Sequence, residues 1–491
     1  MRFPKAETLA DRLWTLMACL WLGLFPLWQD GSFTRITRAK WLGMLLLTAV
    51  CVLLTLLTAV YAALRREKLP FRVKGIQLAA VIYFGWMGLS AWLAPMSGTL
   101  NSRGEITAWM GALRYEGMAT QLCYMMILLV MCLHPVRLKP VCHAAAVALL
   151  VFFAITLLQY AGYNPIGLFP AGRSIRTNYE FQGTIGNIDM VSGYLALVVP
   201  LLLGAFLTAE RGGWQWYAAG MAGVLLWLCI EVQSGLIALV AGLLLTACAM
   251  LRRQEVRRRG WLIAAGVILC AGLRGCILLP WLDGASGLRP DGLTVAPLAL
   301  AAMILALRKP RLRPLTAKQT AAVMAGLLAA GVIGFLLLPL HQGHGGIWEI
   351  QQTLLGHGED AFGSYRLGVW RHTLALAQEH PLLGTGPDTF LHALRLRLAS
   401  LGQQLPETFD NPHNEYLAIL ANCGLPALLA YAAILALRLR TCVRHSAWAL
   451  LAVTVCFAAQ GFFSFSICLV SPMWWCTLGM EEKPPVSYDP V

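Results

Sequence analysis

Charged residues are scarce in this chain. Only 13% of its 491 residues are Asp, Glu, Lys or Arg, whereas a soluble globular protein carries roughly a quarter. A chain with so few charges cannot cover its surface with polar groups in water, and 58% of this one is hydrophobic. The composition therefore excludes a soluble globular protein, and estimates of domain number from chain length do not apply.

Acidic residues are fewer than basic ones, 24 against 38, which gives a formal net charge of +14. Such a charge raises the question of nucleic-acid binding. The basic residues, however, form short clusters between apolar runs, at 65–74, 252–259 and 308–318. This is the pattern of cytoplasmic loops in membrane proteins, so we expect a membrane-embedded chain with no nucleic-acid partner.

The sequence contains no CxxC pair of cysteines. Most of its 14 cysteines lie within or at the ends of apolar runs, as do Cys51, Cys123 and Cys456, and the polar segment 341–412 has none. We interpret them as small buried hydrophobic residues. This pattern argues against a disulfide framework and against a cysteine-based metal site.

Long apolar runs, by contrast, are frequent, and a bilayer span needs about 20 such residues. The run 41–64 has no charge at all. The sequence predicts an all-α polytopic transmembrane bundle of about 12–14 spans. The apolar runs lie at about 13–28, 41–64, 76–95, 117–133, 140–162, 188–208, 215–232, 235–251, 261–281, 293–307, 320–340, 413–437, 446–464 and 467–480.

The distribution of Lys and Arg predicts the orientation. With the N-terminus in the cytoplasm, the inner segments hold roughly twice as many basic residues as the outer ones, as the positive-inside rule requires. One long polar loop, 341–412, then lies outside the cytoplasm. It separates about eleven spans in 1–340 from the last spans in 413–480, and a short tail, 481–491, is cytoplasmic.

The long loop is predicted to contain helices at about 362–378 and 388–401. At its end, Asn411 is a good N-cap and Pro412 suits a first helical position, which would put His413 in the first turn of the next span. The positive end of a helix disfavours imidazolium, so we expect a neutral His413 that can act as a base. The free amides of that turn can hold an anion. Alternatively, His413 only caps a helix among lipid headgroups.

A second candidate lies upstream in the same loop. Arg366 and Trp370 are four residues apart and share one face of a helix. A guanidinium makes forked contacts with phosphate oxygens, which favours an anionic substrate. The alternative is an interfacial amphipathic helix, with Trp370 among the headgroups and Arg366 on lipid phosphate.

Further charges flank the predicted spans on the outer side. They are Arg114, Glu116, Arg173, Arg176, Glu180 and Asp189. Charges near spans are costly and usually face a cavity, although Arg114 and Glu116 could simply anchor a helix at the interface. Deeper in the spans, Glu231 and Arg274 could pair or reach an interface.

Histidines are concentrated in the long loop: seven of the ten lie between His341 and His413. A metal site built from His341, His344 and His357 is therefore conceivable. No pair of these has a firm ligand spacing and no cysteine joins them. We expect no metal and no cofactor.

Several motifs taken together resemble one known family. They are Arg366 with Trp370, 380–387, 412–417 and 422–426, with supporting pieces at 114–117 and 183–187. The set resembles the O-antigen ligase and O-antigen polymerase family, which are membrane proteins of bacterial envelope polysaccharide assembly. The strongest part covers 364–428, and the layout of spans is similar over most of the chain.

The resemblance implies a metal-independent glycosyltransferase of the bacterial inner membrane. The donor would be a glycan on a polyprenyl (undecaprenyl) diphosphate, and the acceptor a sugar hydroxyl outside the cytoplasm. His413 matches the essential His of the family and would assist the acceptor hydroxyl as a base or by orientation. Arg366 matches its loop Arg and would neutralise the diphosphate. Further candidates for substrate binding are Arg114, Glu116, Arg173, Arg176, Trp370, Asn414 and Glu415.

One position departs from the family pattern. Many members carry Ser-Arg-Gly near the start of a middle span, whereas 233–236 here reads Gln-Ser-Gly-Leu. Either another cation, such as Arg173 or Arg176, contacts the diphosphate, or binding is weaker. The alternative function is a transporter or flippase of lipid-linked glycans, which would need a polar pathway through the bundle. A non-catalytic scaffold or sensor is a third.

Overall fold

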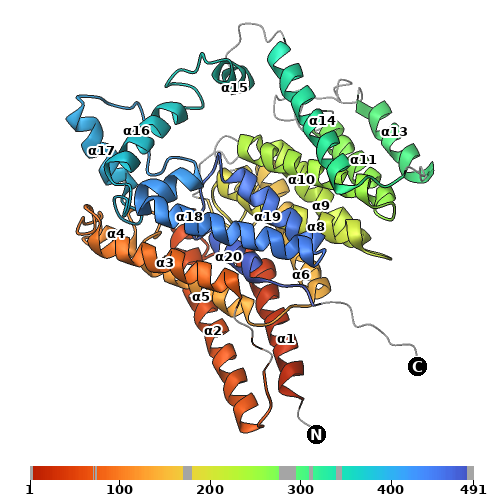
Figure 1. Ribbon diagram of the computed structural model, residues 1–491, viewed down its shortest axis with the longest axis horizontal. Coiled ribbons are helices and arrows are strands. Elements are labelled where there is room, and N and C mark those ends of the chain that lie inside the picture. The colour runs from red at the N-terminus through yellow and green to blue at the C-terminus, as the bar shows by residue number, and fades with distance from the viewer. Residues whose placement is uncertain are drawn as a thin grey trace.

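The computed structural model describes residues 4–69, 71, 74–169, 180–275, 295–308, 313–338 and 346–483. Within these ranges every extended regular element is helical, and the only β-pairings are the isolated bridges Leu100–Ile106 and Val136–Glu482. The predicted all-α architecture is confirmed, and Figure 1 shows the helices gathered into one bundle.

Helices form at all fourteen predicted apolar runs. Eight are long and apolar enough to cross a membrane, the first of them because α1 continues through the short helices η1 (Leu20–Leu24) and η2 (Phe25–Leu27). The eight are α1 (Ala6–Cys19), α2 (Ile36–Leu64), α3 (Gly75–Leu93), α6 (Leu138–Tyr160), α8 (Ile188–Thr208), α10 (Gln233–Arg252), α14 (Ala317–Leu337) and α18 (Glu415–Arg444). The shorter six are α5 (Met118–Cys132), α9 (Trp214–Ile230), α11 (Arg257–Leu273), α13 (Ala296–Arg308), α19 (Trp448–Gln460) and α20 (Ser471–Gly479).

Helix α20 has only nine residues, yet its segment extends along the whole of α5. At one end the backbone N–H of Cys468 donates to Glu116 Oε1 over 2.6 Å, just before α5 begins. At the other end the N–H of Val136, just after α5, donates to the carbonyl of Glu481 over 2.7 Å. The segment 468–481 therefore covers the same distance as α5, about 22 Å at 1.5 Å per helical residue, with a turn before its short helix and extended backbone after it.

Helix α8 forms the centre of the bundle. After Asp189 it carries no charge and its whole apolar stretch is buried, because a helix that is hydrophobic on every side must be covered on every side. Helices α6, α9, α10 and α19 surround it. Its start is fixed by Asn187, whose side chain accepts hydrogen bonds from the N–H groups of Asp189 and Met190.

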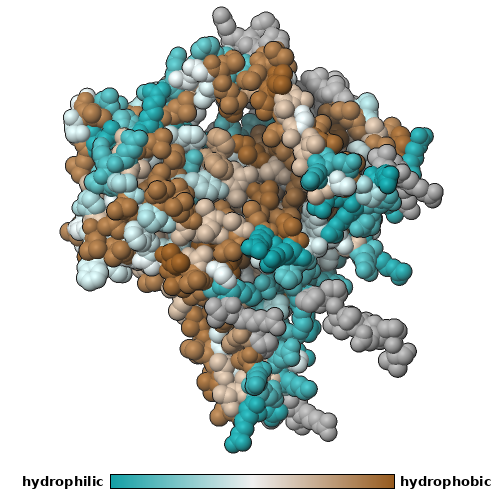
Figure 2. All heavy atoms as spheres, in the orientation of Figure 1, coloured by the Kyte–Doolittle hydropathy of each residue, from teal (hydrophilic) through white to brown (hydrophobic). Residues whose placement is uncertain are grey.

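Helix α14 is the opposite case. Only Thr320 is buried along its length, and large side chains such as Leu327, Ile333 and Leu337 are more than half exposed. Figure 1 shows α14 at one edge of the bundle, and Figure 2 shows extensive hydrophobic surface on the same face. A helix whose one charge, Lys318, lies in its first turn and whose apolar side chains are largely exposed is suited to a lipid environment, which agrees with a membrane protein.

The long polar loop contains three helices, which lie at the top and upper left of Figure 1: α15 (Gly346–Leu354), α16 (Arg366–Glu379) and α17 (Phe390–Ser400). The two predicted loop helices are confirmed, but both begin later than expected. Ser364, Tyr365 and Asp388 adopt left-handed backbone conformations, with φ between 56° and 64°, and such residues cannot continue a right-handed helix. Helix α15 was not predicted.

Helix α18 is broken at Gly424, where φ is 81° and ψ is 177°. The turn 381–387 lies against the break. The N–H groups of Thr385 and Gly386 donate to the carbonyls of Ala421 and Asn422 over 2.9 and 2.8 Å, and the N–H of Leu425 donates to the carbonyl of Pro381 over 2.8 Å. The polar groups that the break exposes are thus satisfied by the loop, as burial requires.

Only glycine fits at this crossing. A Cβ atom on Gly424 would lie 2.0 Å from the carbonyl oxygen of Leu382. We predict that Gly424→Ala lowers the thermal unfolding temperature of the purified protein and destabilises it by more than about 1 kcal/mol, since the side chain meets rigid backbone at a positive φ. Gly326→Ala in α14 is the control, because a Cβ there meets nothing within 4 Å. Equal melting temperatures for the two variants would contradict this account of the crossing.

Candidate functional site

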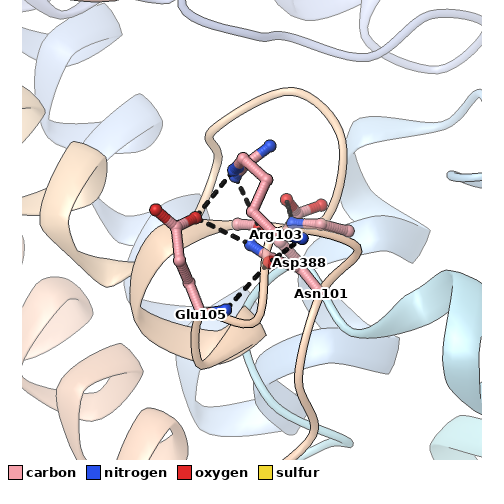
Figure 3. Close-up of polar contacts among 6 residues, drawn as sticks. Asn101, Arg103, Glu105 and Asp388 are labelled. Carbon is pink, nitrogen blue, oxygen red and sulfur yellow. Dashed lines mark hydrogen bonds and ion pairs between the residues drawn. The ribbon is translucent and has the colours of Figure 1, made fainter.

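The loop between α3 and α5 is folded around Asn101. Its amide nitrogen donates to Glu105 Oε2 and to the carbonyl of Gly111 over 3.0 and 2.8 Å, and its side-chain oxygen accepts from the N–H groups of Arg103 and Glu105. Figure 3 shows these contacts, with Asp388 of the long loop beside them. These hydrogen bonds fix the backbone of this loop, which is the first segment of the site and contacts a second one.

That second segment is the start of α17. The N–H of Ala112 donates to Asp388 Oδ2 over 2.7 Å, and the N–H of Met96 donates to the carbonyl of Thr385 over 3.1 Å. Burial raises the pKa of Asp388 to about 7, against the opposing effect of the N–H of Ala112. Asp388 was not among the predicted site residues, because only the tertiary fold brings it to the first loop.

Glu116 lies at the same junction. Its carboxylate accepts hydrogen bonds from the hydroxyl of Tyr124 over 2.9 Å and from the N–H of Cys468 over 2.6 Å. Burial, followed by the nearby Asp388, raises its pKa well above the usual range for a glutamate. Glu116 is therefore enclosed by the protein and is not a simple headgroup anchor.

Arg114 connects the first loop with the end of the long loop. Its Nε and Nη2 atoms make a two-pronged contact with Asp410, at 2.7 and 3.3 Å. Its guanidinium also lies over the ring of Phe465, 4.8 Å from the centroid. The ring of His413 packs edge-on against Phe465 with the centroids 5.0 Å apart. Phe465 thus separates a paired cation from the histidine.

The predicted position of His413 within a helix was wrong. Asn414, not Asn411, is the N-cap, since its side chain accepts the N–H of Leu417 over 3.0 Å. Helix α18 begins at Glu415, so His413 precedes it, in a left-handed conformation with φ 50°. Asn411 instead accepts the N–H of His413 and fixes this bend.

The pKa of His413 is nevertheless lowered, as the sequence predicted. The physical causes are burial and the nearby Arg366, and the carboxylates of Asp189 and Asp410 oppose them. Desolvation and a like charge both disfavour imidazolium, so the imidazole is neutral near pH 7. Its Nδ1 atom is shielded from solvent without a hydrogen-bond partner among the described residues, which is uncommon for a buried polar atom.

Arg366 opens α16 on the same side as His413. Its guanidinium has no hydrogen bond or ion pair within the part of the chain that the structure describes, although it lies near enough to lower the pKa of His413. Trp370, one turn later, donates from its indole nitrogen to the carbonyl of Pro412 over 2.7 Å. The shared helix face was therefore predicted correctly, and it holds Arg366 near the bend at His413.

Glu415, the first residue of α18, binds the turn that carries Phe465. Its Oε2 atom accepts the N–H of Ser466, and its own N–H donates to the carbonyl of Gly461, each over 2.8 Å. Asn414, beside it, is 5% exposed. Both residues therefore hold the local backbone in place around His413.

A polar cavity of about 100 Å³ lies behind these residues. Its lining includes Arg114, Glu116, Asp388, Asp410 and Glu415, but neither His413 nor Arg366. A drug-sized ligand needs at least about 300 Å³, so this cavity is sized for water. A larger ligand would have to lie outside it.

Backbone strain is concentrated at this site. Eight described residues other than glycine have positive φ, and five of them surround it: Tyr115, Ser364, Tyr365, Asp388 and His413. Each such conformation costs on the order of 1–3 kcal/mol and persists where its surroundings enforce it. Strain of this kind collects at functional sites, and here it marks the same segments as the charges do.

Several predicted residues lie elsewhere. Arg173, Arg176, His341 and His344 fall outside the described residues. Arg274 forms an ion pair with Glu231. Glu231 lies two residues before the 233–236 segment, which departs from the family pattern. The pairing predicted as one option for these two charges is confirmed.

Asp388 gives this site a testable dependence on pH. Because its folded pKa of about 7 exceeds the ordinary 3.8, the native state binds its proton more tightly. Its contribution to stability is then full below pH 3.8 and is lost as pH rises through about 7. We predict that Asp388→Asn has a higher melting temperature than the wild type. The difference between the two should grow as pH rises from 4 to 8.

Asp360→Asn serves as the control, since Asp360 is an exposed carboxylate in the same loop. Its melting curve should follow that of the wild type at every pH. Parallel curves for Asp388→Asn and the wild type would contradict the burial of a protonated Asp388.

Part of the chain matches a known family. Residues 291–432 match the family model described as O-Antigen ligase. The matched range includes Arg366, Trp370, Asp388, Asp410 and His413. No curated protein matches the chain.

Proposed function

We propose that this chain, whose residues 291–432 match the O-antigen ligase family model, transfers a glycan from a polyprenyl diphosphate to a sugar hydroxyl. We place the reaction at the extracytoplasmic face of the bacterial inner membrane, within cell-surface polysaccharide synthesis. The family supports glycosyl transfer in general. The donor, the acceptor and the independence from metal are our proposal.

One observation supports the proposal: where a membrane span begins, a neutral histidine lies near enough to Arg366 to feel its charge, and this arginine has no ion-pair partner among the described residues. The donor is an amphiphile whose diphosphate sits at the membrane surface, so the reaction needs a cation and a base at that depth. Arg366 provides a guanidinium with no carboxylate partner in the described part of the chain, and His413 provides an uncharged imidazole.

In the proposed step the acceptor hydroxyl oxygen bonds to the anomeric carbon of the donor. The bond from that carbon to the diphosphate oxygen breaks, and its electron pair leaves with the diphosphate. His413 takes the proton of the hydroxyl. Arg366 binds the departing negative charge, and Asp189 and Asp410 stabilise the imidazolium that forms, since both carboxylates favour protonation of His413.

The remaining residues are proposed to position these two. Arg114 is 31% exposed and keeps N–H groups beyond its contact with Asp410, so it can also contact the diphosphate. Glu116, Asn414 and Glu415 fix the backbone around His413, and Trp370 joins α16 to the bend. Arg173 and Arg176 stay candidates for donor binding from the sequence alone.

The domain layout follows from the same proposal. We assign 364–428 as the core of the transferase site and 341–412 as the extracytoplasmic loop that carries most of it. The spans in 1–340 and 413–480 hold the loop at the membrane surface, and both termini lie in the cytoplasm.

Loss of either central residue should slow transfer strongly. We predict that His413→Ala lowers the rate of glycan transfer by about 10²–10⁴-fold, as for removal of a general base, and that Arg366→Ala lowers it by about 10²–10³-fold. The assay follows consumption of lipid-linked glycan in membranes with matched protein levels. His392→Ala and Arg371→Ala, on the same loop helices, should transfer normally.

Normal transfer by both His413→Ala and Arg366→Ala would rule out this mechanism. If transfer is instead lost because lipid-linked glycan no longer reaches the outer leaflet, the transporter or flippase function replaces it.

The pH profile separates the role of His413 from a structural one. Only neutral His413 can take a proton, so the rate should fall as pH drops through its pKa, which lies below 6.5. Asp410→Asn removes an anion that favours imidazolium and should move this acid limb to lower pH. Arg366→Gln removes a cation that disfavours imidazolium. The remaining transfer activity of this variant should therefore fall at a higher pH than that of the wild type. If the transfer rate falls at the same pH in the wild type and in both variants, His413 is not the base.

A further inference from the structure

A second charged site lies at the other end of the bundle. It is a cavity of about 460 Å³ between the start of α3, the last turns of α18 and the segment after α20. The residues before α3 and after α5 sit at the end of α5 opposite Glu116, about 22 Å along that helix. The predicted topology places this end on the cytoplasmic side.

The lining of the cavity is strongly cationic. It includes Lys74, Arg438, Arg440 and Arg444, against a single described carboxylate, Glu481. Glu481 pairs with Lys74 at 2.7 Å. Neither Arg440 nor Arg444 has a carboxylate partner within the described ranges. Basic side chains therefore outnumber carboxylates in the lining of this cavity, although Glu7 and Glu482 line the adjoining cavity that shares Lys74 and Arg438.

Arg438 is the decisive residue. It is only 3% exposed, so its guanidinium cannot reach bulk water. Its Nη2 donates to the carbonyl of Thr477 over 2.8 Å and its Nη1 donates to the carbonyl of Met480. Its Nε has no partner among the described residues. A guanidinium has five N–H groups, so this buried cation keeps donors that carbonyl oxygens do not satisfy.

A buried cation is costly unless an anion accompanies it. Charged side chains at the ends of spans often only reach toward headgroups, but Arg438 is too buried for that. Guanidinium groups match the forked geometry of phosphate oxygens. Basic pockets between helices on the cytoplasmic side are a known setting for phospholipid headgroups.

We propose that this cavity binds a phosphate group, with Arg438 at its base and Arg440, Arg444 and Lys74 at its mouth. Its volume is that of a ligand site. Its wall also contains Ile76, Leu437 and Leu478, which suits the glycerol and first acyl carbons of a phospholipid. The same chemistry would accept a soluble phosphate. The site is separate from the proposed transfer reaction and does not depend on it.

The test uses the full-length protein in nanodiscs. Phosphatidylglycerol is titrated into phosphatidylcholine discs, and bound lipid is counted by native mass spectrometry alongside the melting temperature. Wild-type protein is expected to retain phosphatidylglycerol and to melt higher with it. Arg440→Gln combined with Arg444→Gln should weaken retention by more than about ten-fold, at about 1 kcal/mol per basic residue.

Arg252→Gln is the matched control, since it removes an exposed arginine from the last turn of another span, α10, that does not line the cavity. Arg438→Gln is measured as well. Because Arg438 also holds the end of α20, the double variant decides the outcome if Arg438→Gln does not fold.

A second arm adds inorganic phosphate to protein in phosphatidylcholine discs. A higher melting temperature with inorganic phosphate, lost in the double variant, identifies a soluble phosphate as the ligand. A response to phosphatidylglycerol alone identifies a lipid headgroup. The proposal is overturned if neither probe raises the melting temperature, or if Arg252→Gln weakens retention as much as the double variant does.

Discussion

Helix α18 is interrupted at Gly424, and the turn 381–387 binds the polar backbone groups on both sides of the break. These few hydrogen bonds join a long polar loop to a membrane helix at a fixed height. Every loop residue in the candidate site depends on them, because Asp388 follows the turn directly and Arg366 lies on the helix that leads into it. The 422–426 motif is therefore explained by backbone geometry and not by chemistry.

The charges around that junction are arranged in two ways. Arg114 and Asp410 neutralise each other, and Asp388 and Glu116 have raised pKa values because they are buried. Arg366 alone is left without a partner among the described residues of this junction. A site with one neutralised ion pair, two carboxyls of raised pKa and a cation without a described partner beside a neutral base is arranged to receive negative charge from outside.

Much of the fold was predictable from the sequence, and the candidate site was predictable only in part. Hydrophobic runs define spans because the bilayer imposes one simple requirement on a helix. The junction at His413 was misread because Asn411, Pro412 and Asn414 all suit a helix start, and only tertiary contacts with Phe465 and Trp370 decide between them.

Asp388, Asp410 and Phe465 could not be identified from their local sequence. Arg114 and Asp410 are 296 residues apart, and Glu116 and Cys468 are 352 apart, so no local pattern joins them. The only hints were turn residues beside acids, such as Pro387 before Asp388. This part of the site is created by long-range packing, which brings the loop between α3 and α5, the long loop and the turn that carries Phe465 to one end of α5.

The most direct measurement is a structure of the protein in lipid with a polyprenyl diphosphate bound. The account predicts that the diphosphate oxygens lie within hydrogen-bonding distance of the Arg366 guanidinium. The imidazole of His413 should face the position next to the first sugar. A diphosphate bound elsewhere, with Arg366 and His413 both remote from it, would contradict the assignment of this site.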